Sequence, residues 1–271
     1  GYDSTGICTC YEGKLLVEKK QGRLSNLIEA TDQGKKLPGT IGIGHTRWAT
    51  HGAPSDINAH PHMSSDGKIA LVHNGIVENY LELKAMLMEE GFTFLSETDS
   101  EVACNLVAYC YRQTGRLLDA MEMALDRIEG SYSFVALCRD DPDTIVAAKN
   151  SSPMVFGFGQ GCNFVASDVT AVLRYTREVV YLSDGELVEM TADSVRFFDR
   201  QGNELEKTPE HIDWELSAAE KGGYDHFMLK EIYEQPSAVA KTISPRIREG
   251  RVVLDDVTLD GEYLKKVSRI Y

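Results

Sequence analysis

Residues 132–166 read YSFVALCRDDPDTIVAAKNSSPMVFGFGQGCNFVA, and this stretch indicates the fold class. Its apolar runs are short, rich in β-branched and aromatic residues, and separated by turn-forming residues, which is typical of strands. We predict strands over 132–138, 144–148, 154–158 and 163–166. Because strands follow one another here and helices come in blocks elsewhere, the pattern favours a layered α+β sheet protein over a doubly wound parallel sheet.

The same periodicities assign elements on both sides of this stretch. Before it we predict a hairpin over 5–20, a helix over 22–31, strands over 39–45, 68–73 and 92–95, a helix over 78–90, a helix that follows residues 96–101 and runs through about 112, and a helix over 116–129. After it we predict a short helix near 169–173, hairpins over 178–190 and 195–206, and a helix over 226–242 that contains Pro236. The strand over 68–73 is expected to end on Asn74-Gly75.

The chain reads as one domain over 1–215 followed by a connecting segment over 216–271. Both ends look cut, since Gly1 takes the place of a starting Met and residues 267–271 resemble the beginning of another strand. The net charge of −14 gives no basic surface for nucleic acid or anionic membrane. Six cysteines in 271 residues are too few for a disulfide scaffold, and we expect free thiols in a cytoplasmic protein.

The densest group of reactive side chains is HTRWATHG, residues 45–52, at the point where a strand gives way to a loop. Arg47, with Thr50 and His51 nearby, suits a carboxylate, because guanidinium binds carboxylates in a planar, paired geometry. Trp48 would form a lid or wall. The alternative is that Arg47 and the histidines only stabilise the loop.

Two further positions complete a possible ligand site. Asn74 and the backbone N–H of Gly75 are the kind of donors that an oxyanion hole requires, although Asn-Gly is more often a tight turn. Asp99 precedes a helix, where it can act as a helix cap, face a ligand ammonium group, or do both. His60 and His62 have no carboxylate or cysteine at zinc-like spacing, so we expect neither a metal site nor a cofactor.

Together these groups describe a pocket for an amino acid whose side-chain carbonyl is attacked, as in acyl transfer from glutamine. The nucleophile is missing: no cysteine is near these motifs, and no serine lies in a recognisable nucleophile elbow.

The motifs HTRWATHG, NAHPH, LVHNGIVEN, SETDSE and KEIYEQP, at residues 45–52, 58–62, 71–79, 96–101 and 230–236, resemble in order and spacing the glutaminase half of the glucosamine-6-phosphate synthases. These are also called glutamine–fructose-6-phosphate aminotransferases (isomerizing), and their glutaminase half is a class II glutamine amidotransferase. The resemblance begins at Gly1, which looks like part of the family's Arg-Gly-Tyr-Asp-Ser motif, and covers the chain.

The resemblance implies a four-layer αββα sandwich of the N-terminal-nucleophile hydrolase type, without its first strand and helix. Arg47, Thr50 and His51 would bind the α-carboxylate of glutamine, Asp99 its α-ammonium, and Asn74 and Gly75 the oxyanion. Trp48 would belong to a mobile loop. The family's nucleophile is an N-terminal cysteine, which would lie before Gly1.

The resemblance also implies a sugar isomerase domain that uses the ammonia to make glucosamine 6-phosphate from fructose 6-phosphate, in hexosamine biosynthesis. It implies a homo-oligomer for the full-length enzyme. Two other interpretations stay open for the chain itself. It binds glutamine or glutamate without chemistry, or it is a regulatory or assembly domain, which intact ligand-facing motifs make less favoured.

Overall fold

The computed structural model describes residues 3–213, 222–254 and 261–269 of the chain. The chain separates into two compact units, Gly1–Asp213 and Trp214–Tyr271. The first unit contains most of the secondary structure and all the residues that the sequence singles out as a site. The second unit, taken by itself, has one long helix and several short elements.

The strands of the first unit are β1 (Ser4–Tyr11), β2 (Lys14–Gln21), β3 (Ile41–Arg47), β4 (His62–Met63), β5 (Ile69–Val77), β6 (Gly130–Cys138), β7 (Asp141–Asn150), β8 (Val155–Phe158), β9 (Asn163–Ala166), β10 (Glu178–Tyr181), β11 (Leu187–Met190), β12 (Val195–Phe198), β13 (Glu204–Leu205) and β14 (Glu210–His211). Its helices are α1 (Leu24–Ala30), α2 (Tyr80–Glu89), α3 (Asp99–Thr114), α4 (Leu117–Leu125) and the 3-10 turn η1 (Val169–Ala171).

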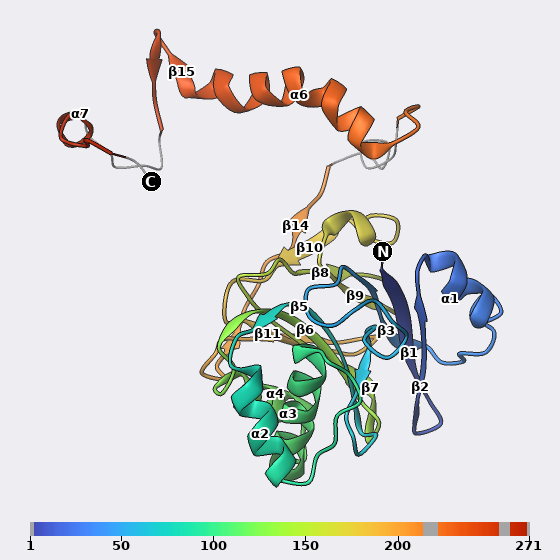
Figure 1. Ribbon diagram of the computed structural model, residues 1–271. Helices are drawn as coiled ribbons and strands as arrows, with labels where there is room; N and C mark the ends of the chain where they lie inside the picture. Colours follow the sequence, from blue (N-terminus) through green and yellow to red (C-terminus); the bar gives the residue numbers. More distant parts are fainter. Residues whose placement is uncertain (1–2, 214–221, 255–260, 270–271) are drawn as a thin grey trace. The chain divides into compact units, whose positions relative to one another are not determined.

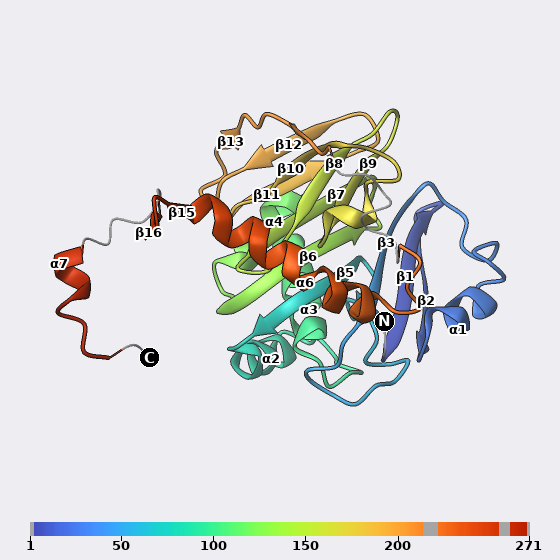
Figure 2. The ribbon, with the colours of Figure 1, turned by 90° about the horizontal axis from the view of Figure 1, so that it is seen from above.

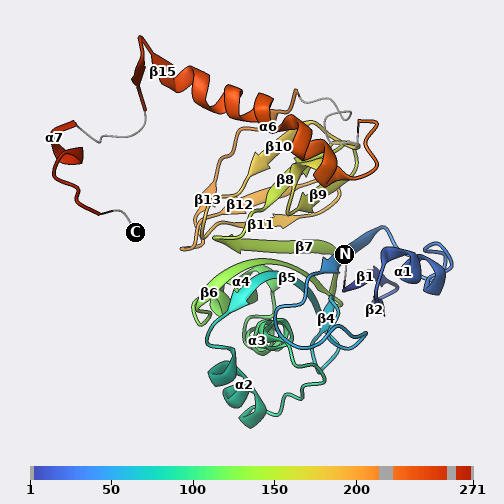
Figure 3. The same ribbon diagram turned by 45° about the horizontal axis from the view of Figure 1, so that its top comes forward.

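These elements form layers. A seven-stranded antiparallel sheet has the order β13-β12-β11-β7-β6-β5-β4, and helices α2, α3 and α4 cover one of its faces (Figures 1 and 3). The other face packs against a four-stranded sheet, β14-β10-β8-β9, and a three-stranded sheet, β2-β1-β3. Helix α1 lies beside β2, as Figure 2 shows from above. Val169 of η1 packs against Val155 and Val179 of the four-stranded sheet. The predicted α+β, four-layer αββα arrangement is therefore confirmed.

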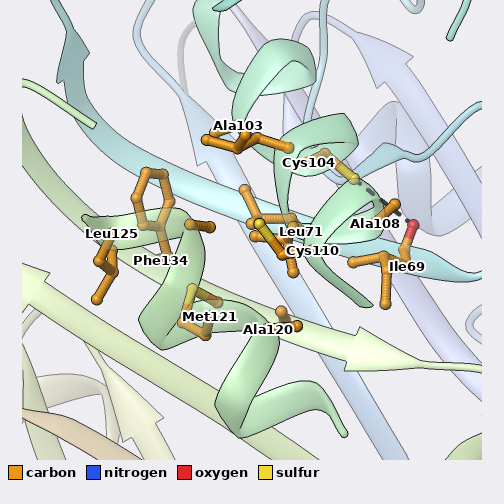
Figure 4. Close-up of a cluster of buried hydrophobic side chains, with 14 of the residues drawn as sticks. Ile69, Leu71, Ala103, Cys104, Ala108, Cys110, Ala120, Met121, Leu125 and Phe134 are labelled. Atoms are coloured by element: carbon orange, nitrogen blue, oxygen red, sulfur yellow. Dashed lines mark hydrogen bonds between the residues drawn. The ribbon is translucent and has the colours of Figure 1, made fainter. Parts of the chain in front are cut away.

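The central sheet is buried on both faces, which explains its long apolar runs. In β5, Ile69 and Leu71 face the helices, while Ala70 and Val72 face the second layer of strands. Figure 4 shows Ile69, Leu71 and Phe134 directed toward side chains of α3 and α4. Side chains alternate between the two faces of a strand, so one run of residues supplies two separate cores.

Most of the predicted elements are confirmed, including the four strands of 132–166 and the first hairpin, which turns through Glu12 and Gly13 with positive φ. The strand predicted over 92–95 is wrong. The backbone N–H of Leu95 donates to the Glu101 carboxylate at 2.9 Å instead of joining a ladder, and the Leu95 side chain is 85% exposed. An apolar side chain facing solvent gives a strand nothing to pack against.

The hairpin predicted over 178–190 is also wrong. Strand β10 pairs with β8 and β14, while β11 pairs with β7 and β12, so the chain crosses between sheets at Asp184-Gly185. This turn is anchored on the end of β7: Asp184 accepts from the N–H of Ser151 at 2.7 Å, and Gly185 donates to the carbonyl of Lys149 at 2.9 Å. The hairpin predicted over 195–206 is confirmed by pairing of β12 with β13.

The second unit contains α6 (Phe227–Ile243), η2 (Ser244–Arg246), a two-strand ladder of β15 (Ile247–Arg248) with β16 (Arg251–Val252), and α7 (Gly261–Leu264). Helix α6 agrees with the predicted helix over 226–242 and includes Pro236. Across the described ranges, no helix is both long enough and apolar enough to cross a membrane.

Candidate active site

A pocket of about 160 Å³ opens where β3, β5 and the N-terminus of α3 meet. Its walls come from four of the motifs that the sequence singles out, which lie far apart along the chain. The lining residues are His45, Thr46, Arg47, Trp48, Thr50, His60, His73, Asn74, Gly75, Thr98, Asp99 and Ser100.

Successive side chains of β5 point to opposite faces of the sheet, so neighbouring pocket residues contact different layers of the fold. His73 continues the face of Ile69 and Leu71, and its Nδ1 lies 2.9 Å from Ser100 Oγ at the start of α3. Asn74 faces the opposite way, and its Oδ1 lies 2.6 Å from His45 Nε2 on β3. Strand β5 thus places neighbouring side chains against the helix layer and against the second layer of strands.

Arg47 is 4% exposed and ends β3. Its Nη2 donates to the carbonyl oxygens of His51 and Gly52, the latter at 3.1 Å, so the guanidinium holds the loop in place. Its Nη1 is buried and finds no hydrogen-bond partner in the described part of the chain. Burial lowers the pKa of Arg47, and the carboxylates of Asp3 and Asp99 oppose this shift. The loop-stabilising role and a free donor for a ligand therefore coexist in one side chain.

Asp99 is 3% exposed and is the first residue of α3. The helix cap is Thr98, whose Oγ1 accepts from the N–H of Glu101 at 3.2 Å, so the expectation that Asp99 caps the helix is wrong. One carboxylate oxygen of Asp99 accepts from the N–H of Val77 at 2.8 Å. Among the residues that the structure describes, the other oxygen has only a 3.5 Å contact with Ser100 Oγ, which leaves it able to accept from an ammonium group.

Asn74 and Gly75 lie inside β5, opposite Ser133 and Tyr132 of β6, and not at the strand's end as expected. Gly75 has φ +132°, and a Cβ there would lie 2.1 Å from the carbonyl oxygen of Ser131. No other residue type fits this position without displacing β6. The strand therefore continues through a local distortion that a side chain would prevent.

Three histidines, His45, His60 and His73, line the pocket, and His62 packs against His60. Burial lowers the pKa of all four. The shift takes the pKa of His73 to about 4, with the Asp99 carboxylate opposing it. Burial takes the pKa of His60 and His62 well below the usual value, and the neighbouring cationic and histidine side chains act in the same direction. For His45, burial dominates and the bond to Asn74 opposes it. Burial therefore favours the uncharged form of these histidines, and Arg47 brings a guanidinium group to the pocket wall.

Of the residues chosen from sequence, the pocket brings together Arg47, Trp48, Thr50, Asn74, Gly75 and Asp99. Trp48 is 74% exposed, as a side chain at the mouth of a pocket would be. His51 does not line the pocket; its ring packs edge-on against Tyr80, with centroids 5.6 Å apart. The six cysteines are free, and none of them lines the pocket.

Sequence reasoning gave no role to several lining residues. His45 had a usable signal, because it lies two residues before Arg47 and so shares its face of β3. Ser100 and His73 had none, since their meeting depends on how α3 packs against β5. His60 stacks on His45 with centroids 4.4 Å apart. Among the residues that the structure describes, no group of three or more His, Cys, Asp or Glu is arranged to hold a metal ion.

Comparison with known proteins agrees with this geometry. A glutamine amidotransferase domain family matches residues 45–174, which include the β3, β5 and α3 walls of the pocket. The full length of the chain is 50% identical to a glutamine–fructose-6-phosphate aminotransferase (isomerizing) of Caldanaerobacter subterraneus subsp. tengcongensis. The chain belongs to the glutamine amidotransferase family.

A second such aminotransferase, from Thermus thermophilus, is 51% identical over 92% of the chain. The chain spans 44% of the first relative's length and 41% of the second's. Among solved structures, the glutamine phosphoribosylpyrophosphate amidotransferase of B. subtilis superposes with a TM-score of 0.62 at 24% identity, over 75% of this chain and 44% of that one. The fold of this amidotransferase domain is thus of the N-terminal-nucleophile hydrolase type.

Proposed function

We propose that the pocket binds glutamine for hydrolysis to glutamate and ammonia. The observation that carries this proposal is that two buried side chains of opposite charge line one small pocket. Arg47 Nη1 has no hydrogen-bond partner among the described residues, and one carboxylate oxygen of Asp99 has a single long contact, at 3.5 Å. Buried charges of this kind are stabilised by partners, and the α-carboxylate and α-ammonium groups of an amino acid supply both. Thr50 adds a hydroxyl for the carboxylate, and Trp48 would cover the bound ligand.

Asn74 and Gly75 would stabilise the oxyanion that forms when the side-chain amide is attacked. Donors placed in advance around a developing negative charge lower the barrier without reorganising during the reaction. Since no thiol of the chain lines the pocket, we assign the attack to the N-terminal cysteine that the family resemblance implies. Its free α-amine would take the thiol proton.

We further propose that the ammonia supports conversion of fructose 6-phosphate to glucosamine 6-phosphate by a sugar isomerase domain of the full-length protein. The names and lengths of the aminotransferase relatives support this step. Residues 1–215 would be the amidotransferase domain and 216–271 the connection. No metal or organic cofactor takes part in the proposed glutamine hydrolysis.

The alternative is a chain that binds glutamine or glutamate without hydrolysing it, and the cysteine-free pocket favours this for the 271 residues alone. Two measurements separate the possibilities. Titration of glutamate into the chain, followed by amide NMR, should shift signals at Arg47, Thr50 and Asp99. Ammonia release from glutamine should occur with the full-length protein and not with the chain. Absence of the NMR shifts in a folded sample would refute the pocket assignment itself.

A further inference from the structure

The hydrogen bond between His45 Nε2 and Asn74 Oδ1, 2.6 Å long, joins two walls of the pocket. From it we infer that His45 is a positioning residue that turns the Asn74 carboxamide so that its N–H₂ group faces the oxyanion. This inference rests on the proposed glutamine hydrolysis and deepens it, because it names what keeps the oxyanion donor in its donating orientation.

A carboxamide can present either of two opposite groups to a site. Its oxygen accepts hydrogen bonds and its nitrogen donates two of them, and a half-turn about the last side-chain bond exchanges these groups. The carboxamide oxygen of Asn74 is hydrogen-bonded to His45, so the carboxamide nitrogen points away from the His45 ring. Within the described chain, Asn74 Nδ2 donates no hydrogen bond to another residue, which leaves its N–H groups for a ligand.

The protonation pattern of His45 determines this orientation. With the proton on Nε2, the ring donates and Asn74 must accept through Oδ1. With the proton on Nδ1, Nε2 becomes an acceptor, and Asn74 would turn its nitrogen toward the ring and its oxygen toward the pocket. A carbonyl oxygen facing a developing oxyanion would repel it, so the Nε2–H tautomer is the one that supports hydrolysis.

The surroundings hold the ring where this bond forms. His45 lies in β3 opposite Gly6 of β1, and its ring stacks on His60 with an interplanar angle of 20°. His60 is itself fixed, since its Nδ1 accepts from the backbone N–H of His73 at 3.2 Å. His45 Nδ1 is buried and has no partner among the described residues, so no other hydrogen bond competes with the bond to Asn74.

The tautomer can be measured without catalysis. In the 271-residue chain labelled with ¹⁵N-histidine, His45 at pH 7.5 should show a protonated Nε2 and an unprotonated Nδ1. The His45→Gln variant, which lacks the ring, identifies the signals. An Nδ1–H tautomer, or a doubly protonated ring, would overturn the inference even if the full-length protein hydrolyses glutamine.

Kinetics of the full-length protein give the second test. Removing an oxyanion donor costs roughly a hundred- to a thousandfold in kcat, so His45→Leu, which leaves Asn74 free to turn, should cost roughly ten- to a hundredfold with KM little changed. His45→Gln keeps an N–H donor and should recover most of the rate. In an Asn74→Ala background, His45→Leu should cause no further loss.

The outcomes are distinguishable. Full additivity of the two substitutions, or equal losses for His45→Leu and His45→Gln, would show that His45 supports the fold and does not orient Asn74. A full-length protein that releases no ammonia would instead refute the proposed function, and the tautomer measurement would still decide whether the His45–Asn74 pair is arranged as inferred.

Discussion

The carboxylate of Asp99 accepts a hydrogen bond from the backbone N–H of Val77 at 2.8 Å, which joins the first residue of α3 to the end of β5. The bond uses one oxygen and fixes the other near Ser100, on the wall of the pocket. Asp99 therefore has a structural part, which any oxygen acceptor can perform, and an electrostatic part, which needs the charge.

Asp99→Asn separates these two parts, because the amide oxygen can still accept from Val77 while the negative charge is lost. Glutamate binding to the chain should weaken by roughly tenfold or more, since hydrogen bonds to charged groups contribute about 1.5–3 kcal/mol. Glutarate, which has no ammonium group, should bind the variant at least as well as it binds the original chain. Calorimetric titration of both ligands checks this, and equal losses for both would mean that Asp99 acts only through the fold.

Arg47→Lys should weaken glutamate binding by at least roughly tenfold, because lysine keeps the charge but not the planar donors. It also removes the bonds from Nη2 to the carbonyls of His51 and Gly52, so amide exchange of residues 48–52 should accelerate. The melting temperature should fall by only about 2–4 °C for each kcal/mol lost in this loop.

The control for this variant is Arg139→Lys, at an exposed ion pair with Asp140. It should change neither ligand binding nor loop exchange. If Arg47→Lys unfolds the chain while Arg139→Lys does not, Arg47 is principally structural, and the assignment of the carboxylate site fails.

Local patterns were sufficient for most of the fold. Continuous apolar runs bounded by turns identified β6 to β9, since a sheet covered on both faces demands such runs. Which strands pair was harder to predict from the sequence. The segment 178–190 has the composition of a hairpin, but its two strands belong to different sheets. Which neighbour a strand takes depends on how the layers pack, and a local window of sequence does not contain that information.

For the candidate site too, the sequence identified individual residues but not the contacts between distant ones. Arg47, Asn74 and Asp99 could be chosen from the sequence because together they supply the groups that an amino acid ligand requires. The bond from Asp99 to Val77 and the contact of His73 with Ser100 could not be predicted, because each joins residues more than twenty positions apart. His51 was chosen for its place in the motif, and its ring packs on Tyr80. A contact of His51 with the ligand carboxylate stays a prediction.

Substitution of Asn74 tests the oxyanion hole in the full-length protein. Asn74→Ala should lower kcat for glutamine hydrolysis by roughly a hundred- to a thousandfold, with a smaller effect on KM, because the lost bond strengthens only in the transition state. Asn74→Asp should be at least as damaging, since it places a negative charge beside the oxyanion. A change confined to KM would make Asn74 a ground-state contact.

The pKa of His73 predicts an acid-labile fold. Its pKa is about 4 in the folded chain against 6.5 as the ordinary value, so between these values the unfolded chain binds a proton that the folded chain does not. The free energy of unfolding should therefore fall as the pH is lowered from about 6.5 to 4, by on the order of 3 kcal/mol from this residue. His45, His60 and His62 shift in the same direction and add to the effect.

Urea unfolding of the chain at several pH values measures this dependence. His73→Gln should flatten the curve by about the contribution of one residue, whatever it does to stability at pH 8. A curve that is flat between pH 6.5 and 4 in the unsubstituted chain would show that the buried histidines titrate normally.

Gly75→Ala should be strongly destabilising, because two costs combine at this position. The backbone has φ +132°, which side chains rarely adopt, and the new Cβ would lie 2.1 Å from the carbonyl oxygen of Ser131 in the neighbouring strand. Strain of about 1–3 kcal/mol and a comparable cost of displacing β6 suggest a total of roughly 3–5 kcal/mol.

Gly67→Ala is the matched control, since Gly67 has φ +69° and nothing within 4 Å of its Cβ position. It should cost only about 1–2 kcal/mol, from the backbone conformation alone. Urea unfolding of both variants gives the comparison. Equal losses would show that β6 moves aside without cost, and that the close approach of β5 and β6 at Gly75 is not what requires a glycine beside Asn74.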